Sequence, residues 1–296
     1  PDSVRIRFFI YLLTLDNMVN SEEKILNKKN FWIIVINSTV FFLLAYLFFY
    51  LITKFATIIA ASMFDIETML YYHKISFYIG KSQWGFDSVK FIFSAGSIIA
   101  LLFGTIFIII YNKVCETDGL LKLFFLWGFF IGYSNFFGSI LMGTMISREF
   151  GHVLNWTYTM DTARMLLIIF SLSVFIIIGI LSTKPILFSA NSYFNFLDKQ
   201  RKEFFIRSQI IVPYFLGIAI IFLVRIPNNH TNNYFEILRL LSMIVTIVPV
   251  IFRCHYYPNF YLDEKPKSIN IGRGYLIFLI IFLFLFRFGL SFGLRF

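Results

Sequence analysis

The sequence predicts an all-α integral membrane protein, a bundle of about seven transmembrane helices with short loops and two interfacial helices. Hydrophobic residues fill 58% of its 296 positions and charged residues only 14%, and the mean hydropathy is +0.77. Since a soluble domain carries about 25% charged residues, too few polar side chains remain to cover a surface in water. The 41 phenylalanines beside only 16 acidic residues also exclude a disordered chain.

Seven segments are apolar for the roughly 20 residues that a helix needs to cross the hydrocarbon core. They are residues 31–53, 91–111, 123–146, 163–183, 208–226, 234–252 and 274–294. Residues 31–296 are therefore expected to form one transmembrane domain. A short linker containing Pro227 predicts that the fifth and sixth spans form a helical hairpin.

Residues 1–30 are expected to form a cytoplasmic interfacial segment. Their apolar run, Phe8 to Leu15, is too short to span a membrane and lacks the small-residue cleavage site of a signal peptide. Two further loops are long enough for surface helices, residues 62–80 and 188–208. Both mix aromatic side chains with lysine or arginine, which is typical of membrane interfaces.

Lysine and arginine predict the orientation, because they concentrate in cytoplasmic loops. Sixteen of them fall on the N-terminal side of the spans and eight on the other side. The N-terminus is therefore predicted to be cytoplasmic and the C-terminus outside, in a bacterial inner membrane or alternatively an organellar one. The net charge of +10 fits contact with anionic lipids and does not require a nucleic-acid partner.

Small residues recur at helical spacing in three spans, and they predict close helix packing. We expect the second and third spans to meet along these stripes and the end of the seventh to contact another subunit. In chain order the residues are Gly96, Ala100, Gly104, Gly128, Gly132, Asn135, Ser139, Gly143, Gly289 and Gly293. A polar pathway through Asn135 and Ser139 is the alternative interpretation.

The loop after the third span holds the candidate site, an outer-face polar cluster made of Arg148, Glu149, His152, Asp161 and Arg164. Its fragment REFGH has the spacing of the HExxH zinc motif, but an arginine replaces the first histidine and cannot bind zinc. An intramembrane metalloprotease is therefore excluded.

A metal site is a weaker possibility, and the sequence predicts no cofactor. His73, His152 and His230 fall on the outer side, where they could bind a metal, but their spacing matches no metal motif. Cys115 and Cys254 are distant in sequence and form no CxxC pair, which excludes a disulfide framework and a thiolate zinc site.

Charged residues inside apolar spans are costly and therefore informative. Glu236 and Arg239 are three residues apart, so we expect them to pair along the sixth span. Arg287 lies about two turns inside the seventh span, where it is expected to reach outward or to contact a carboxylate or a lipid phosphate.

The absence of ionisable groups from the middle of the predicted spans favours a non-catalytic subunit or scaffold of a larger membrane complex, with lipids and other membrane subunits as partners. Two alternatives remain. One is a transporter of a small solute or a lipid, and the other is a lipid-modifying or metal-dependent enzyme that uses residues 147–164.

Overall fold

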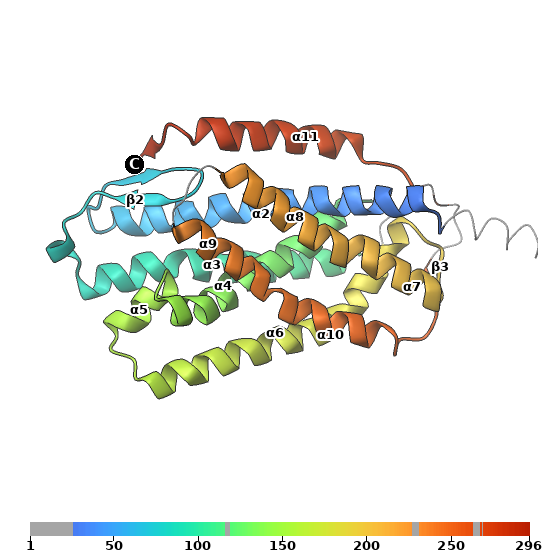
Figure 1. Ribbon diagram of the computed structural model, residues 1–296, viewed down its shortest axis with the longest axis horizontal. Helices are drawn as coiled ribbons and strands as arrows, with labels where there is room; N and C mark the ends of the chain where they lie inside the picture. Colours follow the sequence, from blue (N-terminus) through green and yellow to red (C-terminus); the bar gives the residue numbers. More distant parts are fainter. Residues whose placement is uncertain (1–25, 116–118, 227–230, 263–266, 268) are drawn as a thin grey trace, which may run out of the picture.

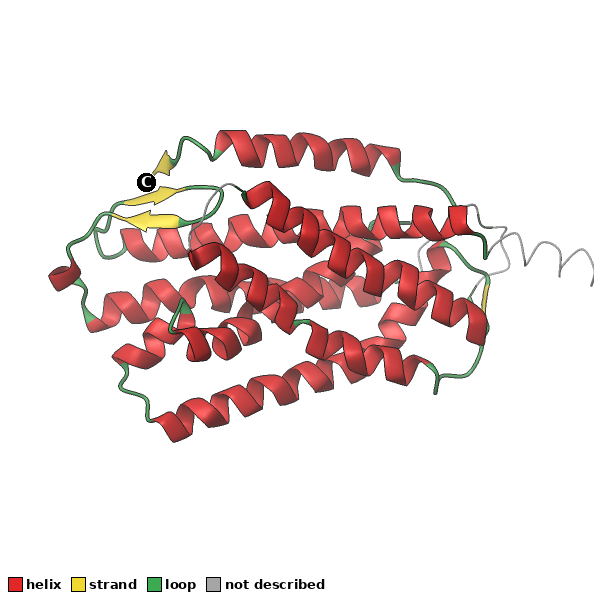
Figure 2. Cartoon of the chain, in the orientation of Figure 1, coloured by secondary structure: helices red, strands yellow, loops and turns green. Residues whose placement is uncertain are grey.

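The structure, a computed structural model, is a long helical bundle with a small β-sheet at one end (Figures 1 and 2). It describes residues 26–115, 119–226, 231–262, 267 and 269–296. Helices make up 76% of it, which fits an all-α membrane protein. The expected segment 1–30 lies almost entirely outside the described residues.

Six helices are long and apolar enough to cross a membrane, and the protein is therefore a multi-pass membrane protein. These candidate spans are Lys28–Ser62, Phe86–Val114, Lys122–Ile146, Asp161–Ser192, Lys199–Arg225 and Tyr234–Cys254. The first three spans are the helices α2 (Lys28–Ser62), α3 (Phe86–Val114) and α4 (Lys122–Ile146). The fourth is α6 (Asp161–Ser189) followed by a 3-10 turn. The fifth combines α7 (Lys199–Ile206) and α8 (Val212–Arg225), and the sixth combines α9 (Thr231–Ser242) and α10 (Ile244–Cys254).

The expected seventh span does not reach the length of the other six. Residues 274–294 form α11 (Arg273–Phe284) and a π-helical turn, Leu285–Gly289. At 1.5 Å per residue these elements extend for only about 25 Å, short of a hydrocarbon core of about 30 Å. Seven spans are therefore not confirmed. Figure 1 shows α11 running along one side of the bundle, beside α2.

The centre of the bundle is formed by α2 and α4, whose side chains are mostly buried. Helices α3, α6, α8 and α9 pack around them, and α10 packs against α6. By contrast, α3 and α6 expose large apolar side chains over much of their length. Such faces suit contact with lipid, where no hydrophobic drive buries them.

The small residues that were expected to pack spans together lie against different parts of the structure. A Cβ on Gly132 would lie 2.7 Å from Gly104 Cα, so α3 and α4 approach closely there. Gly96 instead faces Thr53 of α2, and nothing lies within 4 Å of a Cβ placed on Gly289. Gly293 has a positive φ of +77° and lies beside Met69.

The expectation of a surface helix over residues 62–80 is wrong, because this segment is a β-hairpin. Its strands are β1 (Thr68–Leu70) and β2 (Ile75–Phe77), and β1 also pairs with β5 (Leu294–Arg295). The short strands hold the hairpin against the C-terminal residues, as Figure 2 shows. This long-range pairing cannot be read from the aromatic composition of the segment alone.

Residues 188–208 contain a short helix, but it is not separate from the membrane helices. The strand β3 (Phe196–Leu197) pairs with β4 (Phe260–Tyr261), and α7 then continues through a π-helical turn, Arg207–Ile211, into α8. The expected fifth span therefore starts about two turns earlier than its apolar residues suggest. The linker of the expected hairpin includes residues 227–230, which lie outside the described part of the chain.

Candidate functional site

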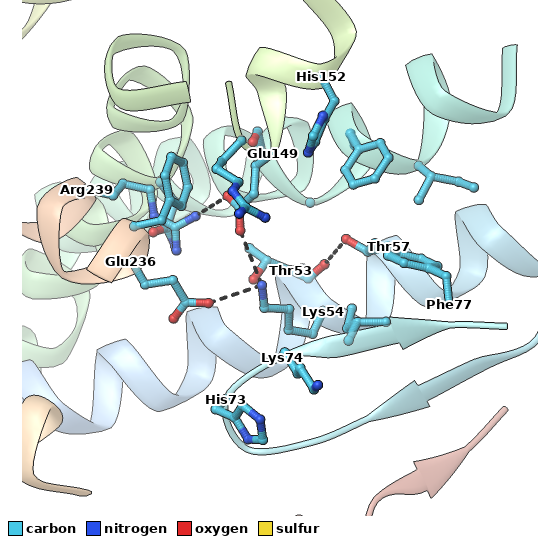
Figure 3. A pocket seen from close by; sticks show the side chains of 18 residues that line it. Thr53, Lys54, Thr57, His73, Lys74, Phe77, Glu149, His152, Glu236 and Arg239 are labelled. Carbon is cyan, nitrogen blue, oxygen red and sulfur yellow. Dashed lines mark hydrogen bonds and ion pairs between the residues drawn. The ribbon is translucent and has the colours of Figure 1, made fainter. Parts of the chain in front are cut away.

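A polar cavity of about 260 Å³ lies at the end of the bundle that carries the β-hairpin (Figure 3). Its walls come from α2, α3, α4, α5 (Phe150–Trp156), α9 and the hairpin. Ionisable side chains from distant parts of the sequence converge on it. The charged and histidine residues of its wall are Lys54, His73, Lys74, Arg148, Glu149, His152, Glu236 and Arg239.

Glu236 of α9 is the more deeply buried of the two carboxylates, with 3% of its side chain exposed. It forms an ion pair with Arg225 of α8, whose side chain is 2% exposed. Lys54 Nζ lies 3.1 Å from its other oxygen, and the Tyr46 hydroxyl donates a hydrogen bond of 3.2 Å. The carboxylate thus satisfies three donors from two other helices, as a buried charge requires.

Glu149 is the second carboxylate, and it lies between α4 and α5. It accepts hydrogen bonds from Arg239 Nη1 at 2.6 Å, Ser139 Oγ at 3.0 Å and Lys54 Nζ at 3.3 Å. Burial by itself raises the pKa of this carboxyl, but the charges of Arg239 and Lys54 outweigh burial and hold the pKa below the usual 4.5. Glu149 is therefore ionised at neutral pH.

The chain makes a strained corner to bring Glu149 into the network. Ser147 ends α4 in the left-handed conformation with φ +57°, and Glu149 follows with φ +44° and ψ −112°. Behind this corner, Gly143 and Gly151 are in such close contact that a Cβ on Gly151 would lie 2.0 Å from the Gly143 carbonyl oxygen. Positive φ in residues other than glycine concentrates at functional sites.

Lys54 joins the two halves of the network, since its ammonium group contacts both Glu149 and Glu236 (Figure 3). Helices α3 and α2 approach each other closely at the cavity wall. A Cβ on Gly96 would be 3.0 Å from both the Thr53 carbonyl oxygen and the Thr57 hydroxyl. The small residue therefore sets the helix separation next to the charged groups.

Positive charge exceeds negative charge around the cavity. Among the described residues, four lysine and arginine side chains line it against two carboxylates, and Arg225 lies directly behind Glu236. Burial and the nearby charge of Arg148 lower the pKa of His152 below the usual 6.5, so this imidazole is neutral at pH 7. The cavity therefore offers a net positive environment to a ligand.

The structure divides the predicted outer-face cluster. Arg148, Glu149 and His152 line the cavity, whereas Asp161 and Arg164 lie at the start of α6 and do not. Arg164 instead donates to the Thr159 carbonyl oxygen at 3.0 Å.

Of the three histidines considered for a metal, His73 and His152 line the cavity, and His230 lies outside the described residues. In the part of the chain that the structure describes, no three or more histidine, cysteine, aspartate or glutamate side chains gather as metal ligands do.

The predicted pairing of Glu236 with Arg239 along one helix is replaced by longer-range contacts. Glu236 pairs with Lys54 and Arg225, and Arg239 pairs with Glu149. Arg287 stays apart from both carboxylates, with its guanidinium 4.0 Å from the centre of the Tyr72 ring.

Lys54 and Arg225 are not among the site residues predicted from the sequence, because both lie at the limits of expected spans, where lysine and arginine are common at the membrane surface. Helix α2 in fact continues to Ser62, well past Lys54. A signal was available in the sequence, since Tyr46, Tyr50 and Lys54 follow one another at steps of four on one helix face.

Comparisons with protein families, characterised proteins and solved structures find no match to this chain, and its function is therefore argued from the geometry of the cavity.

Proposed function

We propose that this protein is a membrane transporter that binds a small anionic solute in the polar cavity. The observation that carries the proposal is the buried network of Lys54, Glu149, Arg225, Glu236 and Arg239 around a cavity inside the helix bundle. Ionisable groups within membrane helices are expensive, and they commonly mark pathways for solutes, ions or protons.

The network supports transport more than a scaffold role. The scaffold interpretation depended on the absence of ionisable groups from the middle of the spans. Lys54 lies about two turns inside its span, and it forms one buried cluster with Arg225 and Glu236 near the ends of two other candidate spans. For helix packing alone, apolar side chains of similar volume are often as stable or more stable than a buried ion pair. A role as a subunit of a larger complex stays a prediction, which co-purifying membrane proteins would support.

The sign of the charge favours an anion carrying carboxylate or phosphate oxygens. In the described part of the chain, four lysine and arginine side chains, Lys74 and Arg148 among them, line the cavity wall against two carboxylates. Arginine and lysine donate strong charge-assisted hydrogen bonds to such oxygens. A bound anion would compete with Glu149 for Arg239 and Lys54, which offers a way for solute binding to rearrange helices.

The predicted orientation gives the proposal a direction. Thr53 and Thr57 of the cavity wall lie near the C-terminal end of α2, the end opposite the predicted cytoplasmic N-terminus. The cavity would then admit solute from the outer side of a bacterial inner membrane. A lipid-modifying enzyme is the remaining alternative, with a phospholipid headgroup in place of the free anion.

Uptake into proteoliposomes tests the proposal with two probes, radiolabelled inorganic phosphate and radiolabelled succinate. We expect saturable uptake of at least one of them, lowered about tenfold or more by Lys74→Gln or Arg148→Gln, since one lost charged hydrogen bond costs about 1.5–3 kcal/mol. The matched control is Lys90→Gln, which removes an exposed lysine outside the cavity.

The outcomes separate the anion transporter from the headgroup alternative. If neither anion is taken up and neither raises the unfolding temperature, an anion transporter is refuted. A phospholipid that stays bound to the purified protein and leaves in the Arg148→Gln variant would support the headgroup alternative.

A further inference from the structure

One winding face of α2 leads from Lys54 at the cavity through three aromatic side chains to Ser38 in the opposite half of the bundle. Lys54, Tyr50, Tyr46, Phe42 and Ser38 follow at steps of four, and each step turns about 40° around the helix, so the line winds slowly around α2. Helix α8 packs along α2, and its preceding π-helical turn, Arg207–Ile211, also contacts α2. The contacts along this face fall into three layers.

The first layer is the floor of the cavity network. The Tyr46 hydroxyl donates to Glu236, and the Arg225 guanidinium lies 5.9 Å from the centre of the Tyr46 ring. Tyr46 therefore belongs to the charged cluster and also begins the aromatic packing below it.

The second layer is aromatic and closed. Phe42 is fully buried, and its ring packs edge-on against Trp127 with the ring centres 4.9 Å apart. Tyr214 of α8 lies 6.4 Å away in the same manner. A Cβ on Gly217 would lie 2.2 Å from Phe42 Cδ1, so the backbone of α8 rests directly on the ring. The Phe42 ring therefore fills the space between α2 and α8 at this level.

The third layer is polar again, one turn of α2 further along. The Ser38 hydroxyl donates to the Gln209 carbonyl oxygen at 2.5 Å and accepts from Trp127 Nε1 at 2.9 Å. Gln209 has no exposed surface, and neither its side-chain oxygen nor its nitrogen has a hydrogen-bond partner among the described residues.

A buried glutamine amide without partners is unusual enough to require an explanation. An unsatisfied buried polar group destabilises the folded protein, and such groups commonly mark a bound water, an ion or a functional role. Gln209 also lies in a π-helical turn, a distortion that is frequent at functional sites. Two independent features thus single out the same residue.

We infer that the solute path runs from the cavity along the α2–α8 interface, that the Phe42 ring is its gate, and that Gln209 with Ser38 forms an inner binding station. This inference rests on the proposed transport function. The side-chain amide N–H of Gln209, which has no partner among the described residues, supplies a donor for an anion that has passed Phe42, and Ser38 holds the Gln209 backbone in place. The same residues would hold water when no solute is present.

Cysteine accessibility tests the gate without knowledge of the natural solute. The background carries Cys115→Ser and Cys254→Ser, and Gln209→Cys supplies the reporter thiol; Ser38→Cys is a second reporter. An anionic methanethiosulfonate is added to the protein in nanodiscs, because its sulfonate resembles the proposed solute in charge. We expect slow modification with Phe42 in place and a rate at least tenfold higher with Phe42→Ala.

The matched control is Phe41→Ala, which removes an equally buried ring that faces Tyr275 instead of α8. It should leave the reporter protected. Phe42→Leu repeats the test with a smaller loss of packing if Phe42→Ala does not fold. Adding Arg148→Glu should slow the modification again, because the new negative charge in the cavity repels the reagent.

Three results would overturn the gate. They are an unchanged rate with folded Phe42→Ala or Phe42→Leu protein, an equal increase with Phe41→Ala, or an increase that Arg148→Glu does not affect. The transport proposal and the gate can fail independently. If neither probe is taken up but the reporter thiol is modified faster in the Phe42 variants, the anion assignment is refuted. If uptake is normal but the reporter thiol stays protected in every Phe42 variant, the gate alone is refuted.

Discussion

Replacing Arg225 with methionine should strongly destabilise the protein, because the Glu236 carboxylate would stay buried without its arginine partner. Both side chains of the pair are nearly inaccessible, at 2% and 3% exposure. Opposite charges about 4 Å apart attract by about 4 kcal/mol at an effective dielectric constant near 20. Removing one member of a buried pair typically costs about 3–5 kcal/mol. Because Lys54 Nζ remains 3.1 Å from a Glu236 oxygen, we expect the loss of stability to lie near the lower end of this range, about 3 kcal/mol.

The measurement is the free energy of unfolding in mixed detergent micelles, with a double-mutant cycle. Arg225→Met combined with Glu236→Leu should lose less stability than the two single changes together, by at least about 1 kcal/mol. The control is Arg207→Met, which breaks the exposed pair with Glu203 and should cost less than about 1 kcal/mol. A cycle that is simply additive, or an Arg225 variant as stable as the control, would refute the reasoning.

Three further predictions follow from the packing, the corner and the thiols. Gly132→Val should lower the unfolding temperature clearly, because its Cβ would meet backbone atoms of α3 at 2.7 and 2.8 Å, whereas Gly289→Ala should change it little; equal effects would contradict this packing. The free energy of unfolding of the wild type should exceed that of Glu149→Gln by its full amount above pH 4.5, the usual pKa of the carboxyl. This difference should disappear as the pH falls through the lowered pKa that Glu149 has in the folded protein, and a difference that persists in acid would contradict this assignment. In the folded protein, maleimide should modify the partly exposed Cys115 faster than the buried Cys254, as mass spectrometry can follow.

The helical content and six of the seven expected spans follow from long apolar segments in the sequence, since a helix satisfies its own backbone in lipid. Their limits are harder to predict. The expected first span ends at residue 53 because Lys54 is charged, yet α2 continues because Glu149 and Glu236 neutralise that charge from elsewhere in the bundle.

The candidate site is only partly visible in the sequence for the same reason. Arg148, Glu149 and His152 are close together in sequence, whereas the packing of α2 and α8 brings Lys54 to the cavity and Arg225 behind Glu236. The hairpin over residues 62–80 likewise depends on pairing with Leu294 and Arg295. Periodicity describes one helix at a time, and it does not determine which distant carboxylate a lysine will meet.

The strained corner at Glu149 is held in place by the contacts of its own side chain. A positive φ at a residue other than glycine costs on the order of 1–3 kcal/mol. Here the contacts of the Glu149 side chain with Arg239, Lys54 and Ser139 offset that cost. If the proposed anion took Arg239 or Lys54 for itself, part of that stabilisation would be lost and the corner would be freer to relax. By reciprocity, the anion would bind the relaxed corner more tightly than the strained one, by the factor by which its binding favours relaxation.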